Sequence, residues 1–101
     1  MLLGKVVGTV VATKKEPELV GLRLLLVREF DAKWQATGKV IVAVDAMDAG
    51  DGEVVLFAAG SSARLTAVTK DRPVDHVIMA IVDAVNADGK TVYQKDTEYN
   101  G

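Results

Sequence analysis

Short apolar runs rich in β-branched residues alternate with polar turn segments along most of the chain. Four runs have the length and composition of strands: Gly4–Thr13, Gly21–Phe30, Lys39–Ala46 and Glu53–Ala59. The segments between them contain proline or clusters of aspartate and glycine, which are turn signals. They are too short for the crossover helices that join parallel strands. The pattern therefore predicts an all-β, mainly antiparallel barrel or sandwich.

The segment Pro73–Asn86 is ambiguous in its periodicity. Its valines and isoleucines recur at helical spacing, and Pro73 suits a first helical turn. Most of these residues are β-branched, however, and they lose side-chain freedom in a helix. The residues alone leave helix and strand open here. Two smaller signals are clearer, because Gly8 inside the first run predicts a bulge or bend and Asp88–Gly89 predicts a hairpin turn before one more strand.

The composition indicates one small domain that associates with other chains. The 101 residues fit a single domain, and 50% of them are hydrophobic. A domain of this size has a large surface for its volume, so it does not easily bury that much apolar material alone. Contact with copies of itself would bury the remainder, and we therefore expect an oligomer.

Charge and cysteine content argue against several functional classes. Cysteine is absent, which excludes disulfides and cysteine-based metal sites and favours a reduced, cytosolic setting. The formal net charge of −2 gives no electrostatic reason to bind nucleic acid or anionic lipid. The apolar start of the chain ends at Lys14 and Lys15 and is interpreted as a strand, not as a targeting segment. No run approaches the ~18 apolar residues of a membrane span, so we expect a soluble protein without a membrane partner.

The titratable residues form no recognisable catalytic or metal-binding pattern. The one histidine, His76, lies in an apolar segment without a partner at a catalytic spacing, which favours a partly buried structural residue. Acidic residues gather in one loop, at Asp45, Asp48, Asp51 and Glu53. Their spacing does not match a calcium loop, and loop acids beside glycines more often cap turns and stay solvated. We therefore expect no catalytic residue, no metal site and no cofactor.

The segment GSSAR, Gly60–Arg64, follows the fourth apolar run directly. It lacks the lysine of a phosphate-binding loop and the flanking glycines of a nucleophile elbow. Ser61 or Ser62 is well placed to cap a short helix through the following ARLTAV, with a gain of ~1 kcal/mol. A helix cap is the structural prediction for this segment, and it leaves the function open.

Four segments of the chain resemble those of one known family. They are GKVVGTVVAT, GLRLLLV, VAVDAMDAGDGEVVLFAAGSSAR and RPVDHVIMAIVD, in that order. They are similar to the EutN/CcmL family, the pentameric vertex proteins of bacterial microcompartment shells. The likeness runs from Gly4 to about Asp83, and its most specific block is VDAxxAGxGExVLxxxGSSAR over residues 44–64.

The resemblance implies a fold. It implies a small antiparallel β-barrel related to the oligonucleotide-binding (OB) topology, with one short helix after the GSSAR segment. It places this barrel domain in residues 1–93 and leaves a polar C-terminal tail in residues 94–101. It also resolves the ambiguous segment in favour of a turn at RPVDH and a strand through VIMAIVDAV.

The resemblance also implies which residues matter. In a ring of five subunits with a narrow axial hole, Gly60, Ser61 and Ser62 would lie nearest the axis and line the pore. Structural or interface roles would fall to Arg64, Asp45, Gly50, Gly52 and Glu53. The apolar surface buried in the ring is expected mainly on strand faces around Val6–Val10 and Val40–Val44.

The implied function is structural and not enzymatic. The chain would form a homopentameric vertex cap that docks among hexameric shell proteins of a polyhedral microcompartment in the cytoplasm, without a nucleic-acid partner. A cyclic pentamer uses a head-to-tail interface, so each subunit presents two different complementary patches. The alternative is an OB-like binding module for an oligonucleotide or small ligand, which the acidic balance and the few scattered aromatic residues disfavour.

Overall fold

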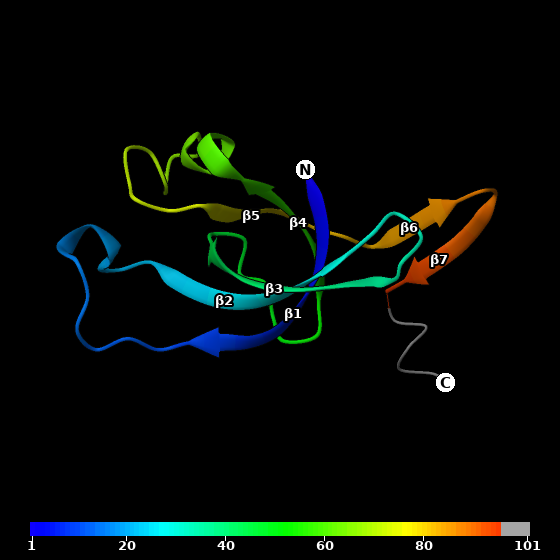
Figure 1. The fold of residues 1–101 in the computed structure, drawn as a ribbon, viewed down its shortest axis with the longest axis horizontal. Coiled ribbons are helices and arrows are strands. Elements are labelled where there is room, and N and C mark those ends of the chain that lie inside the picture. Colours follow the sequence, from blue (N-terminus) through cyan, green and yellow to red (C-terminus); the bar gives the residue numbers. More distant parts are fainter. Residues whose placement is uncertain (96–101) are drawn as a thin grey trace.

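The chain forms a five-stranded barrel with a separate hairpin at its C-terminal end (Figure 1). The structure is a computed structural model, and it describes residues 1–95. The barrel strands are β1 (Leu2–Val10), β2 (Arg23–Phe30), β3 (Ala36–Asp45), β4 (Val54–Ala59) and β5 (His76–Ile81). The hairpin strands are β6 (Ala84–Ala87) and β7 (Lys90–Gln94), and two short 3-10 helices are η1 (Pro17–Leu19) and η2 (Gly60–Arg64).

The barrel closes in the strand order β1-β2-β3-β5-β4. The expected all-β, OB-like barrel is confirmed, and each of the four apolar runs forms a strand near its expected position. All barrel pairs are antiparallel except β3 with β5. That parallel pair is brief, because only Val44–Val77 and Asp45–Ile78 are in register. The barrel is therefore closed between β3 and β5 by these two residue pairs alone.

Two glycines in β1 adapt the strand to the small barrel. The register of β1 against β2 shifts between Val6 and Gly8, which confirms the bulge predicted at Gly8. Gly4 is needed for a different reason, because a β-carbon at this position would clash with Val27 and press on Phe57. The absent side chain lets β1 pass close to the packed interior.

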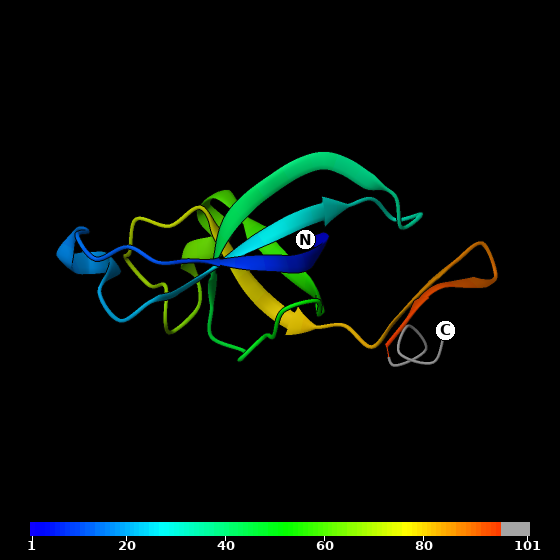
Figure 2. The same ribbon diagram turned by 90° about the horizontal axis from the view of Figure 1, so that it is seen from below.

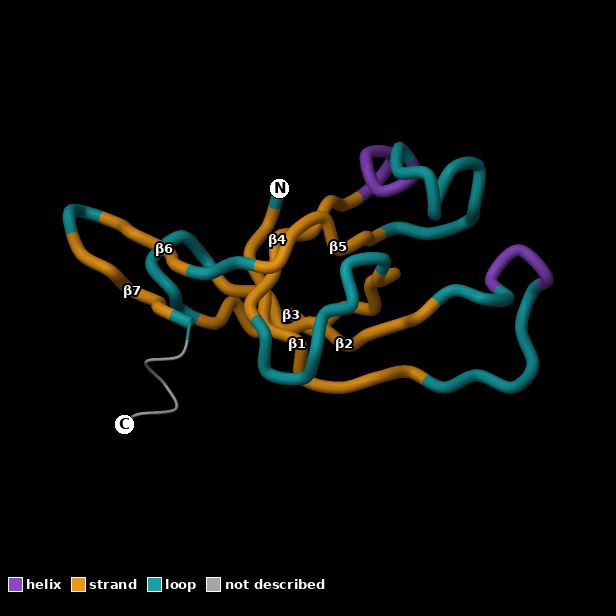
Figure 3. Tube along the Cα trace, turned by 180° about the vertical axis from the view of Figure 1, so that it is seen from behind, coloured by secondary structure: helices purple, strands orange, loops and turns teal. Residues whose placement is uncertain are grey.

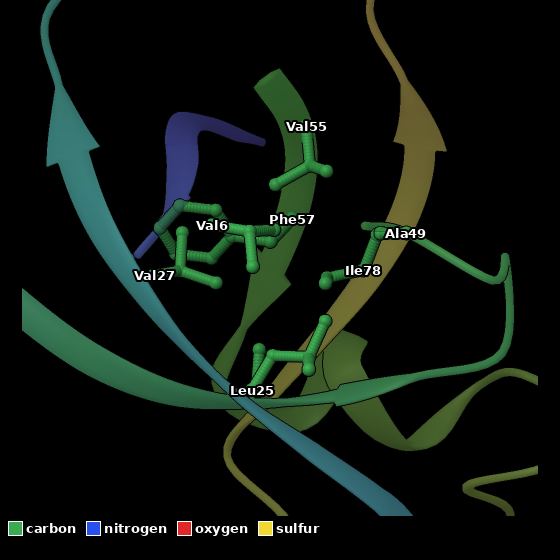
Figure 4. Packing of buried hydrophobic residues seen from close by; sticks show 8 residues of the cluster. Val6, Leu25, Val27, Ala49, Val55, Phe57 and Ile78 are labelled. Atoms are coloured by element: carbon green, nitrogen blue, oxygen red, sulfur yellow. The ribbon is translucent and has the colours of Figure 1, made fainter. Parts of the chain in front are cut away.

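The barrel interior is a single apolar cluster contributed by every barrel strand (Figure 4). Its larger members are Val6, Leu25, Val27, Val55, Phe57 and Ile78. Each is at most 1% exposed, so each contributes roughly 2 kcal/mol of burial. A second cluster lies beneath η2 and contains Val44, Ala58, Ala63, Val74 and Val77. It fixes η2 to the barrel wall.

The ambiguous segment forms strands, as the family resemblance implied. A run of bends precedes β5, and β5 and β6 are separated by two residues, Val82 and Asp83. The hairpin predicted at Asp88–Gly89 is confirmed, with φ of 53° and 73° at these two residues. Figures 1 and 2 show β6 and β7 projecting from the end of the barrel opposite η1.

An aromatic stack connects this hairpin to the turn between β2 and β3. The rings of Phe30 and Trp34 are stacked with centroids 4.1 Å apart, and Trp34 lies 5.1 Å from Tyr93 of β7. Asp31 shapes the turn by accepting hydrogen bonds from the backbone N–H groups of Lys33 and Gln35. The tail predicted for residues 94–101 lies outside the described residues from position 96 onward.

The prediction of a short helix after GSSAR, capped by serine, is wrong in its details. The GSSAR residues themselves form the 3-10 helix η2, and its N-cap is Ala59 without a side-chain cap. The helix does not continue because Thr66 and Thr69 bond to each other's backbone N–H groups, at 3.1 and 3.3 Å. Such local side-chain bonds compete with helical hydrogen bonds.

Within residues 1–95, no helix has the length and apolar character needed to cross a bilayer.

Candidate functional site

The loop between β3 and β4, residues 45–53, is organised around the carboxylate of Asp45. Its Oδ2 lies 2.6 Å from Nη1 of Arg23 and accepts the N–H of Ala49 at 3.0 Å. Its Oδ1 accepts the N–H of Met47 at 2.9 Å. The expectation of a solvated loop acid is therefore wrong for Asp45, whose side chain is only 1% exposed. A buried carboxylate with three partners fixes the start of the loop.

Glu53 closes the other end of the same loop. Its Oε1 accepts the N–H of Gly50 at 2.6 Å, and its Oε2 lies 2.9 Å from Nζ of Lys95. The hydrogen bond from Lys95, followed by the one from Gly50, lowers the pKa of Glu53 below its ordinary value of 4.5. Gly52 has a φ of +83°, which allows the tight turn between Gly50 and Glu53. The loop is thus held at both ends by the hydrogen bonds of a carboxylate.

The polar side chains of the η2 corner, Gly60–Arg64, are mostly exposed, in contrast to those of the 45–53 loop. Gly60, Ser61 and Ser62 are exposed, and within residues 1–95 the side chains of both serines make no hydrogen bond. The corner is held from behind, where Ala63 is fully buried and Arg64 donates to the carbonyl of Val74 at 3.1 Å. The structure therefore presents three small residues outward on a firm base.

The structure brings together some of the residues singled out in the sequence and separates others. Asp45, Gly50, Gly52 and Glu53 belong to one loop, whereas Arg64 and the outward residues of η2 lie at a different corner of the barrel. His76 is half-buried at the start of β5 and meets the ring of Phe57 edge-on at 5.9 Å. Among residues 1–95, no group of three histidine or acidic side chains is positioned to hold a metal ion.

Sequence reasoning missed the cationic partners of the loop. Arg23 and Lys95 lie 22 and 42 positions from their carboxylates, and no local spacing connects them. The only available signal was indirect, since a carboxylate in an apolar strand end requires a cation or several N–H donors nearby.

The profile of the family described as "Ethanolamine utilisation protein EutN/carboxysome" matches residues 1–83, which include the whole barrel, the 45–53 loop and η2. The chain belongs to the EutN/CcmL family. Only the β6–β7 hairpin lies beyond the matched part of the described chain.

Individual family members match over nearly their full lengths. The carboxysome shell vertex protein CcmL of Gloeobacter violaceus is 42% identical, over 98% of this chain and 99% of its own. Its structure superposes with a TM-score of 0.89 over 94% of this chain and 98% of its own, at 43% identity. The microcompartment shell vertex protein EutN of Salmonella typhimurium is 41% identical over 94% of this chain and 96% of its own.

A third family member is described with its oligomeric state. The pentameric microcompartment shell protein GrpN of Rhodospirillum rubrum superposes with a TM-score of 0.78 at 41% identity. The match covers 86% of this chain and 99% of GrpN. This EutN/CcmL chain therefore shares its fold and more than a third of its residues with relatives from different shells.

Proposed function

We propose that this chain is a structural, non-catalytic vertex subunit of a bacterial microcompartment shell and that it assembles as a ring of five. The observation that carries the proposal is the near full-length likeness to vertex proteins of carboxysome and other microcompartment shells. Its proposed location is a shell in the bacterial cytoplasm, with hexameric shell proteins as neighbours. A flat array of hexamers cannot close, and five-fold units at the corners supply the missing curvature.

The surface of the subunit supports self-association. Several large apolar side chains are more than a third exposed, among them Met1, Val11, Val20, Val40, Val42 and Leu65. Of the two strand faces expected to supply this surface, the β3 part around Val40 and Val42 is exposed, at 47% and 44%. The β1 part is different, because Val6 belongs to the core. Apolar side chains exposed side by side on one strand, as Val40 and Val42 are, are typical of a surface that contacts another chain.

The polar residues of the family block support a structural role. Asp45 and Glu53 bond to backbone N–H groups of the 45–53 loop and to Arg23 and Lys95, which supports a structural role for both carboxylates. Gly60, Ser61 and Ser62 are exposed, and within residues 1–95 the two serine side chains make no hydrogen bond, which suits residues that meet their own copies around a ring axis. Arg64 fixes this corner to the segment before β5 by donating a hydrogen bond to the carbonyl of Val74.

The aromatic residues among positions 1–95 do not support the alternative of an oligonucleotide-binding barrel. Such proteins stack bases on aromatic side chains in a basic groove. Here Phe30, Trp34 and Tyr93 pack on one another at the hairpin end of the barrel. The groove between β3 and the start of β5 is lined mainly by aliphatic residues, with Asp75 and His76 also in its lining. We expect no gel shift with single-stranded DNA at low salt.

Native mass spectrometry tests the proposed ring directly. The chain has a mass of 10.7 kDa, so five copies give about 54 kDa and six give about 64 kDa. We expect the five-copy species. A monomer or a hexamer at micromolar concentration would contradict the proposal. Co-expression with a hexameric shell protein then tests the vertex role, with closed particles expected when the chain is present and open sheets or tubes when it is omitted.

A further inference from the structure

The η2 corner has an apolar hollow on the side of the barrel that carries β1. The hollow has a volume of about 310 Å³. Its lining includes Leu2, Ala58, Ser62, Leu65 and Met79. Leu65 stands at its edge with 82% of its surface exposed, which is unusual for a leucine directly attached to a rigid element. We call this region the β1-side surface.

The other side of the same corner has an apolar groove. It has a volume of about 390 Å³ and lies where β3 and β5 separate beyond their short parallel contact. Its aliphatic lining includes Leu24, Ile41, Val42, Val44 and Val74. Figure 3 shows β4, β5 and η2 in one part of the molecule, and β2 and η1 in the part facing it. We call this region the β3-side groove, and Val42 at its edge is 44% exposed.

The barrel order places these two surfaces on opposite flanks of η2. The pair β4–β5 carries η2, and it is followed by β1 on one side and by β3 on the other. A head-to-tail ring needs two different patches on one subunit, directed to opposite neighbours. If the outward residues of η2 meet near the ring axis, the patches must lie on the two flanks of that corner. The two apolar surfaces occupy those flanks.

We propose that the β1-side surface of one subunit packs against the β3-side groove of the next copy of this chain. This inference rests on the proposed ring. Leu65 of one copy enters the groove beside β3, and Val42 of the neighbour covers the hollow beside β1. Each surface combines a recess with one exposed apolar side chain at its edge, so the fit is reciprocal. Ser62 lines the hollow and therefore lies between the ring axis and this interface.

Paired cysteines test this contact, because the chain has no cysteine of its own. We expect the double variant L65C/V42C, oxidised or treated with a short bismaleimide, to give a ladder of covalent products up to five chains on a denaturing gel. Each single variant should give no ladder. A mixture in which the L65C and V42C chains have been unfolded and refolded together should stop at dimers, because each chain then carries one thiol.

Native mass spectrometry of the same samples separates the two proposals. A five-copy mass with a ladder supports both. A five-copy mass without a ladder overturns the interface and leaves the vertex function intact, and a monomeric mass overturns both. Val42→Asp should abolish the pentamer while the circular dichroism spectrum stays that of a folded barrel. Val11→Asp is the matched control, since Val11 is 87% exposed and lines neither surface, and it should leave the pentamer unchanged.

The groove has one other conceivable occupant, a small apolar ligand. In the intact pentamer of the V42C variant, a bulky thiol reagent should react at least tenfold more slowly than after dissociation of the ring in mild denaturant. Equal rates would show that the groove stays open in the pentamer and would overturn the proposal.

Discussion

The two halves of the family's most specific block, the 45–53 loop and the η2 corner, use their polar residues in opposite ways. In the loop, the carboxylates of Asp45 and Glu53 bond to backbone N–H groups and to cations from other parts of the chain. At the η2 corner, Ser61 and Ser62 are exposed and their side chains have no hydrogen bond within residues 1–95.

The difference shows which residues of the block serve the subunit and which serve its surroundings. Buried polar groups with complete hydrogen bonding stabilise one conformation of a chain. Gly60 is favoured by the backbone itself, which has a φ of +65° at this residue. The exposed serine side chains contribute little to the subunit, so we expect the reason for serine there to lie in contacts outside it. The predictions below test this division.

The largest effect is expected from a bulky side chain at the η2 corner. Ser61→Trp should abolish the five-copy species in native mass spectrometry, because five indoles do not fit where five small residues converge. The far-ultraviolet circular dichroism spectrum should remain that of the wild type, since the Ser61 side chain is exposed and makes no hydrogen bond within residues 1–95. Ser61→Ala is the control and should keep the pentamer. An intact Ser61→Trp pentamer would place this corner away from the axis.

Next in size is the loss of the buried carboxylate of the loop. Asp45→Ala removes the acceptor of two backbone N–H groups and the partner of Arg23, and it should lower the free energy of unfolding by about 3 kcal/mol. Chemical denaturation at fixed protein concentration measures the change. Asp48→Ala is the control, because its side chain is fully exposed and 3.7 Å from Arg23, and it should leave the free energy of unfolding close to that of the wild type. Equal costs for the two variants would mean that Asp45 is not the organising residue.

A smaller effect, with a distinct pH dependence, is expected at the other end of the loop. Glu53→Gln should lower the free energy of unfolding by about 1 kcal/mol at neutral pH, because it weakens the bond to Lys95 and keeps an acceptor for Gly50. The pKa of Glu53 is lower in the folded chain than its ordinary value of 4.5. Its contribution is therefore present above pH 4.5 and is lost as the pH falls from there through the folded pKa.

The variant should consequently be less sensitive to acid than the wild type. Denaturation curves at a series of pH values between neutral and about pH 3 should converge for the two proteins at the acidic end. Asp51→Asn, in the exposed part of the same loop, should leave the pH profile unchanged. Parallel profiles for wild type and Glu53→Gln would show that this carboxylate does not carry the acid sensitivity.

The sequence predicted the barrel well because its signals are local. β-Branched runs separated by short turns predict an antiparallel β-structure, and Gly8 and Asp88–Gly89 mark a bulge and a hairpin through backbone geometry that few other residues allow. The family resemblance resolved the segment around β5 that periodicity left open.

The sequence was a poor guide wherever distant residues meet. Asp45 was expected to be solvated because no residue close to it in the sequence indicates that Arg23 of β2 is its partner. The serine cap was expected because Ser61 follows a strand and precedes helix-compatible residues. The mutual bonds of Thr66 and Thr69 end the helix instead.

The central claim is that the outward residues of η2 gather around a five-fold axis, and cross-linking of Ser61→Cys tests it most directly. A short bismaleimide should join neighbouring copies into dimers only, because each chain carries one thiol. In a ring of five, one chain always lacks a partner, so the dimer should reach a plateau at roughly four fifths of the protein. Lys90→Cys, on the projecting hairpin, should give no cross-link (Figure 1). Complete conversion to dimer, or no dimer at all from Ser61→Cys, would contradict the account.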